Sequence, residues 1–105
     1  MRKITIDAIN KFMANKPFKR DNTKVILSDG QTELWLYSTL IARCTNGKYY
    51  VTNGGYETNT TSERLRNLVR HYECGNVYIK QFNMYYEDSN KIVTTLDSNY
   101  FTQIR

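Results

Sequence analysis

The sequence predicts one α+β domain, in which an antiparallel β-meander is combined with two amphipathic helices. Three observations predict this class. The chain has 105 residues, enough for one domain with one modest core. Its middle alternates short β-prone runs with Asp-Gly and Asn-Gly turns. Two other segments carry apolar residues at helical spacing. We therefore expect residues 1–105 to fold as a single domain.

The first helix is expected in residues 4–17, ITIDAINKFMANKP. Thr5 is the candidate N-cap, because a threonine hydroxyl can accept a hydrogen bond from a free amide of the first turn. Pro17 ends the pattern, since the residue before a proline disfavours the helical conformation. The apolar residues that share one face at helical spacing are Ile6, Ile9 and Phe12 or Met13.

In residues 23–53 the sequence pattern changes from helical spacing to short β-prone runs. Three turn-forming pairs, Asp29-Gly30, Ser38-Thr39 and Asn46-Gly47, separate the runs TKVILS, QTELWLY, LIARC and KYYVT. Asp-Gly and Asn-Gly suit type I′ hairpins, because both central residues of such a turn take positive φ. A meander of about four antiparallel strands is the expected result.

The second helix is expected in residues 59–72, NTTSERLRNLVRHY. Thr60 and Glu63 have the spacing of a capping box, in which each side chain binds an amide at the start of the helix. After this helix, residues 76–101 return to strand-like runs, which turn near Cys74-Gly75-Asn76 and Asp88-Ser89-Asn90. The residues expected on the buried face of the helix are Leu65, Leu68, Val69 and Tyr72.

Motifs for catalysis or metal binding are missing from the sequence. His71 is the only histidine, and with Cys74 it forms a lone His-x-x-Cys pair, which is too few ligands for a zinc site. There is no G-x-S-x-G nucleophile turn and no P-loop. We expect a non-catalytic protein without metal or cofactor.

The sequence also lacks the features of a membrane or secreted protein. No apolar run approaches the roughly 20 residues needed to cross a bilayer, and the N-terminal residues lack the apolar stretch of a signal peptide. We expect a cytoplasmic protein that makes no membrane contact and keeps Cys44 and Cys74 reduced.

The first candidate binding surface is the outer side of the second helix. The chain has 15 Lys and Arg against 10 Asp and Glu, a net charge of +5 that favours polyanionic partners or serves solubility alone. Arg66 and Arg70 are one helical turn apart, with Arg64 nearby. Like charges at this spacing repel weakly unless an anion neutralises them. A phosphate backbone or an acidic protein patch would do so; the alternative is a solvated helix face.

The second candidate surface is one face of the meander, where aromatic residues alternate with Lys and Arg. Its candidate residues are Trp35, Tyr37, Arg43, Lys48 and Tyr50. Such residues can stack on single-stranded bases or form a hot spot for a protein partner, or they can belong to the core.

The register of the strands decides between these readings. If the strand runs through Ser38-Thr39 without turning, Trp35 and Tyr37 join Arg43 and Tyr50. A tight turn at Ser38-Thr39 would instead group Trp35 and Tyr37 with Ala42, Cys44, Tyr49 and Val51.

The stretches ITIDAIN, NTKVI, LYSTLIAR and above all TNTTSERLRNL resemble a group of small bacteriophage proteins with an NTT-x-ERL motif. The resemblance covers most of the first 80 residues. That group has Gly-Asn where this chain has Ser38-Thr39, and Trp where it has Tyr56. It also has Asn-Gly at Arg66-Asn67, which would end the second helix near residue 67 and leave residues 69–73 for a strand. The resemblance implies a phage context and no site residues.

The leading hypothesis is a phage accessory protein in the cytoplasm of the infected bacterial host, which binds nucleic acid or a nucleic-acid-processing complex. The rival is a protein-directed inhibitor of a host defence system or host enzyme, similar in role to an anti-CRISPR protein, which would bind an acidic host protein surface. A third hypothesis is a minor virion component. The sequence leaves the oligomeric state open.

Overall fold

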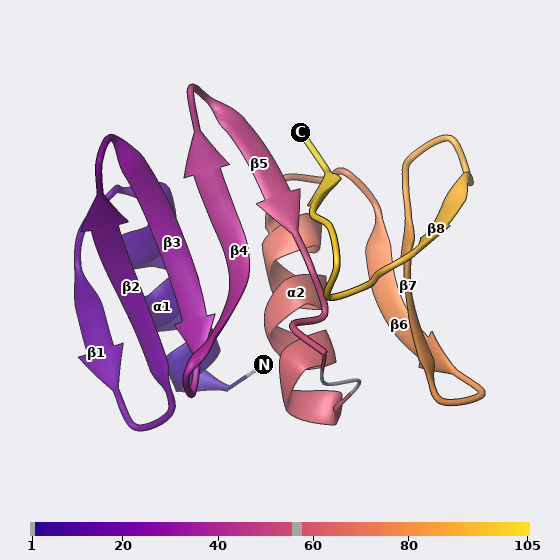
Figure 1. Cartoon of the computed structure of the whole chain (residues 1–105), viewed down its shortest axis with the longest axis horizontal. Coiled ribbons are helices and arrows are strands. Elements are labelled where there is room, and N and C mark those ends of the chain that lie inside the picture. Colours follow the sequence, from indigo (N-terminus) through magenta and orange to yellow (C-terminus); the bar gives the residue numbers. More distant parts are fainter. Residues whose placement is uncertain (1, 56–57) are drawn as a thin grey trace.

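The computed structural model describes residues 2–55 and 58–105, and it confirms the α+β class (Figure 1). Tyr56, one of the positions where the chain departs from the phage group, lies outside the described residues. The elements in chain order are α1 (Lys3–Met13), β1 (Phe18–Arg20), β2 (Thr23–Ser28), β3 (Gln31–Leu36), β4 (Thr39–Thr45), β5 (Lys48–Val51), α2 (Asn59–His71), β6 (Asn76–Lys80), β7 (Asn83–Glu87), β8 (Val93–Thr95) and β9 (Thr102–Gln103).

The larger sheet has six antiparallel strands in the order β1-β2-β3-β4-β5-β9. The predicted meander, β2 to β5, is confirmed, but the two outer strands were not predicted. Strand β9 brings the end of the chain back to β5, where Tyr50 pairs with Gln103 and Val51 with Thr102. Residues 76–95 form a second sheet, β6-β7-β8, beside α2 (Figure 1).

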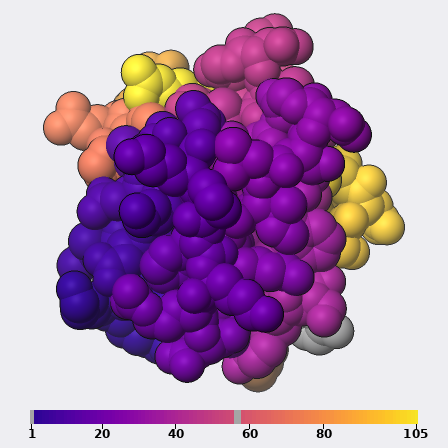
Figure 2. Space-filling view, turned by 90° about the vertical axis from the view of Figure 1, so that its left-hand side faces the viewer, coloured from indigo at the N-terminus to yellow at the C-terminus, as the bar shows by residue number. Residues whose placement is uncertain are grey.

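Strand β1 forms the free edge of the larger sheet next to α1, on the side of the molecule shown in Figure 2 (indigo and violet). It has three residues, and two of them, Lys19 and Arg20, are cations. Short, charged edge strands resist pairing with other chains.

Two of the three predicted turns are confirmed. Asp29-Gly30 and Asn46-Gly47 have positive φ at both residues, as type I′ hairpins require. The third turn was predicted one residue too late. Leu36 pairs with Thr39, so the turn residues are Tyr37 and Ser38, and Tyr37 takes a φ of 57°.

A β-bulge fixes which side chains face the core. The pairing of β3 with β4 shifts between Leu34 and Trp35, so β4 carries one extra residue there. Consecutive residues Ile41 and Ala42 are consequently both buried. Trp35 lies on the opposite face of the sheet from Leu34, together with Arg43 and Tyr50. The chain does turn after β3, yet Trp35 has the neighbours expected for the uninterrupted strand.

Both helices pack on the core side of the larger sheet, and α2 also packs on the smaller sheet. The single core contains side chains from every layer: Ala8, Ile9, Phe12, Leu34, Ile41, Val51, Leu65, Leu68, Val69, Val77, Met84 and Tyr86. Ile6 is an exception to the predicted face of α1, because it is 41% exposed.

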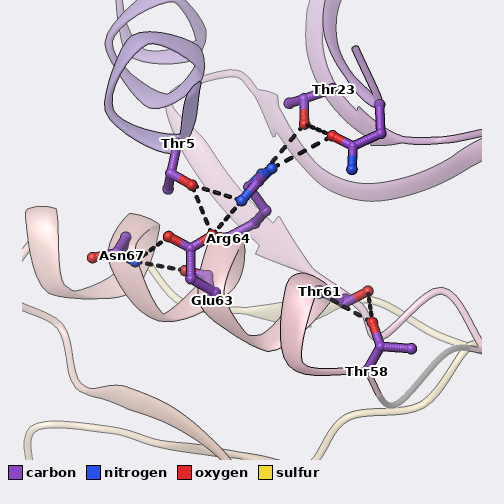
Figure 3. Close-up of polar contacts among 8 residues, drawn as sticks. Thr5, Thr23, Thr58, Thr61, Glu63, Arg64 and Asn67 are labelled. Atoms are coloured by element: carbon purple, nitrogen blue, oxygen red, sulfur yellow. Dashed lines mark hydrogen bonds and ion pairs between the residues drawn. The ribbon is translucent and has the colours of Figure 1, made fainter. Parts of the chain in front are cut away.

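Both predicted N-caps are wrong. Helix α1 begins after Arg2, and Thr5 lies inside the helix with its side chain fully buried. The N-cap of α2 is Thr58, whose hydroxyl accepts a hydrogen bond from the Thr61 amide at 3.2 Å (Figure 3). Thr60 therefore forms no capping box with Glu63. Helix α2 continues to His71, so it does not end near residue 67.

Candidate functional site

One face of the six-stranded sheet carries the candidate binding surface. The helices pack on the other face, and no helix among the described residues covers this one (Figure 1). Cross-strand pairing places Lys24 opposite Trp35, Glu33 opposite Arg43, and Arg43 opposite Tyr50. We define the open sheet face as the residues Lys19, Lys24, Gln31, Glu33, Trp35, Arg43, Lys48, Tyr50 and Phe101.

Arg43 lies at the centre of the open sheet face. Its guanidinium carbon is 4.9 Å from the centroid of the Tyr50 ring and 4.6 Å from that of Phe101. In the described part of the chain, Arg43 has no acidic partner within salt-bridge distance, and its buried Nε has no hydrogen-bond partner. The rings lie against the guanidinium group by cation–π contact. Because Nε is buried, a ligand would have to bind the donors of the two terminal nitrogens.

Glu33, the carboxylate of this face, is already engaged by its own strand. One carboxylate oxygen accepts a hydrogen bond from Gln31 Nε2 at 2.6 Å, and the other accepts one from the indole Nε1 of Trp35 at 3.1 Å. Glu33 therefore orients the Trp35 ring and does not pair with Arg43, although the two residues lie opposite each other.

A second cation–aromatic pair lies next to the first. The Lys24 ammonium is 5.4 Å from the centroid of the Trp35 ring. Lys19 pairs with Lys24 at the β1 side, and exposed Lys48 pairs with Thr45 at the far end of the face. The face thus combines flat aromatic rings with an excess of positive charge, the composition used to bind single-stranded nucleic acid.

Tyr37 lies at one end of this face, in the β3–β4 turn, and is 69% exposed. It helps to line a surface hollow of about 450 Å³ to which Lys19 and Lys24 also contribute. The structure therefore brings five of the eight predicted residues together: Trp35, Tyr37, Arg43, Lys48 and Tyr50.

Arg64 is not on a surface, in contrast to the prediction for the second helix. Its side chain is 1% exposed and lies between α1, α2 and the start of β2 (Figure 3). It donates hydrogen bonds to Thr5 Oγ1 at 2.6 Å and Thr23 Oγ1 at 3.3 Å, and it pairs with Glu63. Arg64 joins three elements of the fold.

The other two arginines of this helix do not form a basic face either. Arg66 donates from Nε to the carbonyl of Val77 at 2.9 Å and from Nη2 to Ser62 Oγ at 2.8 Å, so it fastens α2 to β6. Arg70 is exposed, but α2 lies on the helix side of the larger sheet. Arg70 is therefore separate from the open sheet face.

The described residues contain no cluster of three or more His, Cys, Asp and Glu side chains that could hold a metal ion. Both cysteines are free. Burial raises the pKa of the Cys74 thiol, which disfavours the reactive thiolate. None of the helices in the described ranges has the length and apolar composition to span a membrane.

Sequence reasoning missed Lys19, Lys24 and Phe101. The alternation of TKVILS places Lys24 on the face opposite Val25, so the strand period could have identified it. Phe101 could not be found in this way, because it reaches Arg43 only through the pairing of β9 with β5.

The profile of one protein family, described as Kyanoviridae Gp96 protein, matches residues 1–103. The chain belongs to this family. The Gp96 family is a phage protein family of unknown function, so the resemblance to phage proteins is confirmed at the level of the family. The Gp96 match also includes residues 81–103, beyond the first 80 residues to which the resemblance applied. No curated protein and no solved structure matches the chain.

Proposed function

We propose that this protein is a non-catalytic phage accessory protein, which binds a single-stranded nucleic acid on the open sheet face in the cytoplasm of the infected bacterium. The observation that carries the proposal is Arg43. This half-buried cation is held between two rings without an acidic partner in the described residues. An unpaired, partly desolvated charge is costly, and a phosphate or a base edge would satisfy it.

The other groups of the face suit the two parts of a nucleotide. Trp35 and Tyr50 offer ring surfaces for bases, and stacking of this kind tolerates any sequence. Lys19, Lys24 and Lys48 offer point charges for phosphates. Because no helix among the described residues covers this face, a long nucleic-acid strand can enter at one edge of the sheet and leave at the other.

The intrinsic fluorescence of Trp35 gives a direct test, because it is the only tryptophan in the chain. We expect a single-stranded oligonucleotide to change this fluorescence with saturation. Four cations on the face predict that log K falls with log salt concentration with a slope of about −3. Arg43→Ala should reduce that slope by about 0.7 and weaken binding.

The matched control is Arg70→Ala, which removes an equal charge from α2. It should leave the affinity within about twofold of the wild type. Arg43→Lys keeps the charge but loses the planar group, and should bind more weakly than the wild type. If Arg43→Ala and Arg70→Ala lose affinity for the oligonucleotide equally, net charge, and not the open sheet face, holds the ligand.

Affinity capture from host lysate, with and without nuclease, tests the class of partner. Partners that disappear after nuclease treatment support the proposal. A stoichiometric host protein that survives nuclease, together with no oligonucleotide binding at low salt, would make the protein a protein-directed inhibitor.

We also propose that the NTT-x-ERL segment is a signature of the fold and not of the ligand site. Its Glu63 and Arg64 tie α2 to Thr5 in α1, and its Thr61 amide binds the N-cap hydroxyl of Thr58. Substitutions in this segment should lower thermal stability, and variants that stay folded should keep their affinity for oligonucleotides.

A further inference from the structure

The segment between β8 and β9 connects the open sheet face to the smaller sheet. Phe101, at one end of this segment, stacks on Arg43. At its start, the carbonyl oxygen of Asp97 accepts a hydrogen bond from Thr52 Oγ1 at 2.5 Å, and that of Leu96 accepts one from Asn53 Nδ2 at 2.9 Å. These bonds fix the segment to the residues that follow β5.

Tyr100 occupies the junction between the two sheets. Its side chain is 48% exposed, and its hydroxyl donates to the carbonyl oxygen of Thr95 in β8 at 2.8 Å. Among the described residues, β7 is the one strand that pairs with Thr95, because β8 is the edge strand of the smaller sheet. The hydroxyl therefore anchors the ring against this edge, next in sequence to Phe101.

The aromatic residues continue on the outer face of the smaller sheet. Thr95 pairs with Tyr85, and Tyr85 pairs with Tyr78. The Tyr78 and Tyr85 rings have centroids 5.6 Å apart and an interplanar angle of 31°. Val77, Met84 and Tyr86 fill the core side of this sheet, so Tyr78 and Tyr85 lie on the side away from α2.

The outer face of the smaller sheet, which carries Tyr78 and Tyr85, has no excess of positive charge. On the same outer face, Lys80 lies at one end of the β6–β7 pair and Glu87 at the other. The two charges offset each other, in contrast to the excess of cations on the open sheet face. A ligand held here would be held by its flat apolar parts, because no net charge attracts its phosphates.

We propose that the nucleic-acid site extends beyond the larger sheet: the strand leaves the open sheet face at Phe101, crosses Tyr100 and stacks its bases on Tyr85 and Tyr78. This inference rests on the proposed function. It assigns phosphate binding to the larger sheet and base stacking to the smaller sheet.

The test compares two lengths of oligothymidylate, about 5 and about 16 nucleotides, near the limits of the site sizes known for small single-strand-binding domains. Trp35 fluorescence reports binding of both. We expect Tyr85→Thr, which retains a strand-forming residue, to weaken binding of the longer oligonucleotide by roughly tenfold. Binding of the shorter one should stay within twofold, and the salt slope should not change. Tyr85→Phe keeps the ring and should bind like the wild type.

Tyr100→Ala provides an independent variant outside the strands, and it should reproduce the selective loss for the longer oligonucleotide. Thermal unfolding confirms that each variant is folded. If Tyr85→Thr and Tyr100→Ala bind both lengths like the wild type, the site ends at Phe101 and the inference is overturned, while the proposed function stands. If the wild type binds neither length at low salt, the proposed function fails and the inference fails with it.

Discussion

Arg64→Met is the most informative change to the fold. The thioether side chain follows the path of the arginine stem and leaves little empty volume, but it removes the charge. Thr5 Oγ1 and Thr23 Oγ1 lose a donor, and Glu63 loses its counter-ion. Because Arg64 joins α1, α2 and β2, the loss affects the whole domain.

The magnitude follows from the burial of each partner. Removing one member of a buried ion pair costs about 3–5 kcal/mol. Glu63 keeps 18% of its side chain exposed, so water recovers part of that cost. We expect a loss of about 3 kcal/mol, at the lower end of that range. In a domain of this size this lowers the melting temperature by about 15 °C.

Thermal unfolding followed by circular dichroism measures the effect, with Arg70→Ala as the exposed control on the same helix. That control should stay within about 0.5 kcal/mol of the wild type. Adding Glu63→Gln to Arg64→Met removes the unpaired carboxylate, so the double variant should be at least as stable as Arg64→Met alone. If Arg64→Met has the same melting temperature as Arg70→Ala, the buried contacts of Arg64 do not hold α1, α2 and β2 together.

Three further predictions concern stability. A hydrogen bond from Arg20 holds the pKa of Asp7 below its usual range. The ionised carboxylate therefore stabilises the fold fully above about pH 4, and this stabilisation is lost as the pH falls through the lowered pKa of Asp7. Melting temperatures in acid should therefore fall less for Asp7→Asn than for the wild type, and equal falls would contradict this. Phe82 is 92% exposed with a φ of 67°, so Phe82→Gly should raise the free energy of unfolding in urea by about 0.5–1 kcal/mol; a decrease would show that the ring packs on something. Gly75 has a φ of 137°, and a Cβ there would lie 2.0 Å from the carbonyl oxygen of Glu87. Gly75→Ala should cost about 2–3 kcal/mol, and an unchanged melting temperature would refute the close approach.

The elements that local residues specify could be predicted from the sequence. Asp29-Gly30 and Asn46-Gly47 fix two hairpins through their own φ angles, and the apolar spacing identifies both helices. Strands β1 and β9 have three residues and two residues, too few for a periodic pattern, and β9 depends on a pairing across half the chain. The cap of α2 was wrong because Thr58, Thr60 and Thr61 lie close together at its start, and only Thr58 takes the N-cap position. The cap of α1 was wrong because the Thr5 hydroxyl bonds Glu63 and Arg64 of α2 inside the core, while Arg2 takes the N-cap position without a side-chain hydrogen bond.

The candidate site was predictable only in part. The sequence left two registers open, and only one of them grouped Trp35 with Arg43 and Tyr50. The bulge in β4 decides that these residues share a face, and its position depends on packing. Arg64 was misplaced because a buried arginine is rare without partners. Two of its partners, Thr5 and Thr23, come from α1 and the start of β2, and the local sequence around α2 does not reveal them.

The proposed function places a single-stranded nucleic acid on the open sheet face. Titration of isotope-labelled protein with an oligonucleotide, followed by amide and indole NMR shifts, tests it most directly. The indole N–H of Trp35 gives one identifiable signal, because the chain has one tryptophan. We expect this signal and the amides of Lys24, Arg43 and Tyr50 to shift together, while the amide of Arg70 stays in place. Shifts confined to α2, or no shifts at low salt, would contradict the proposed function.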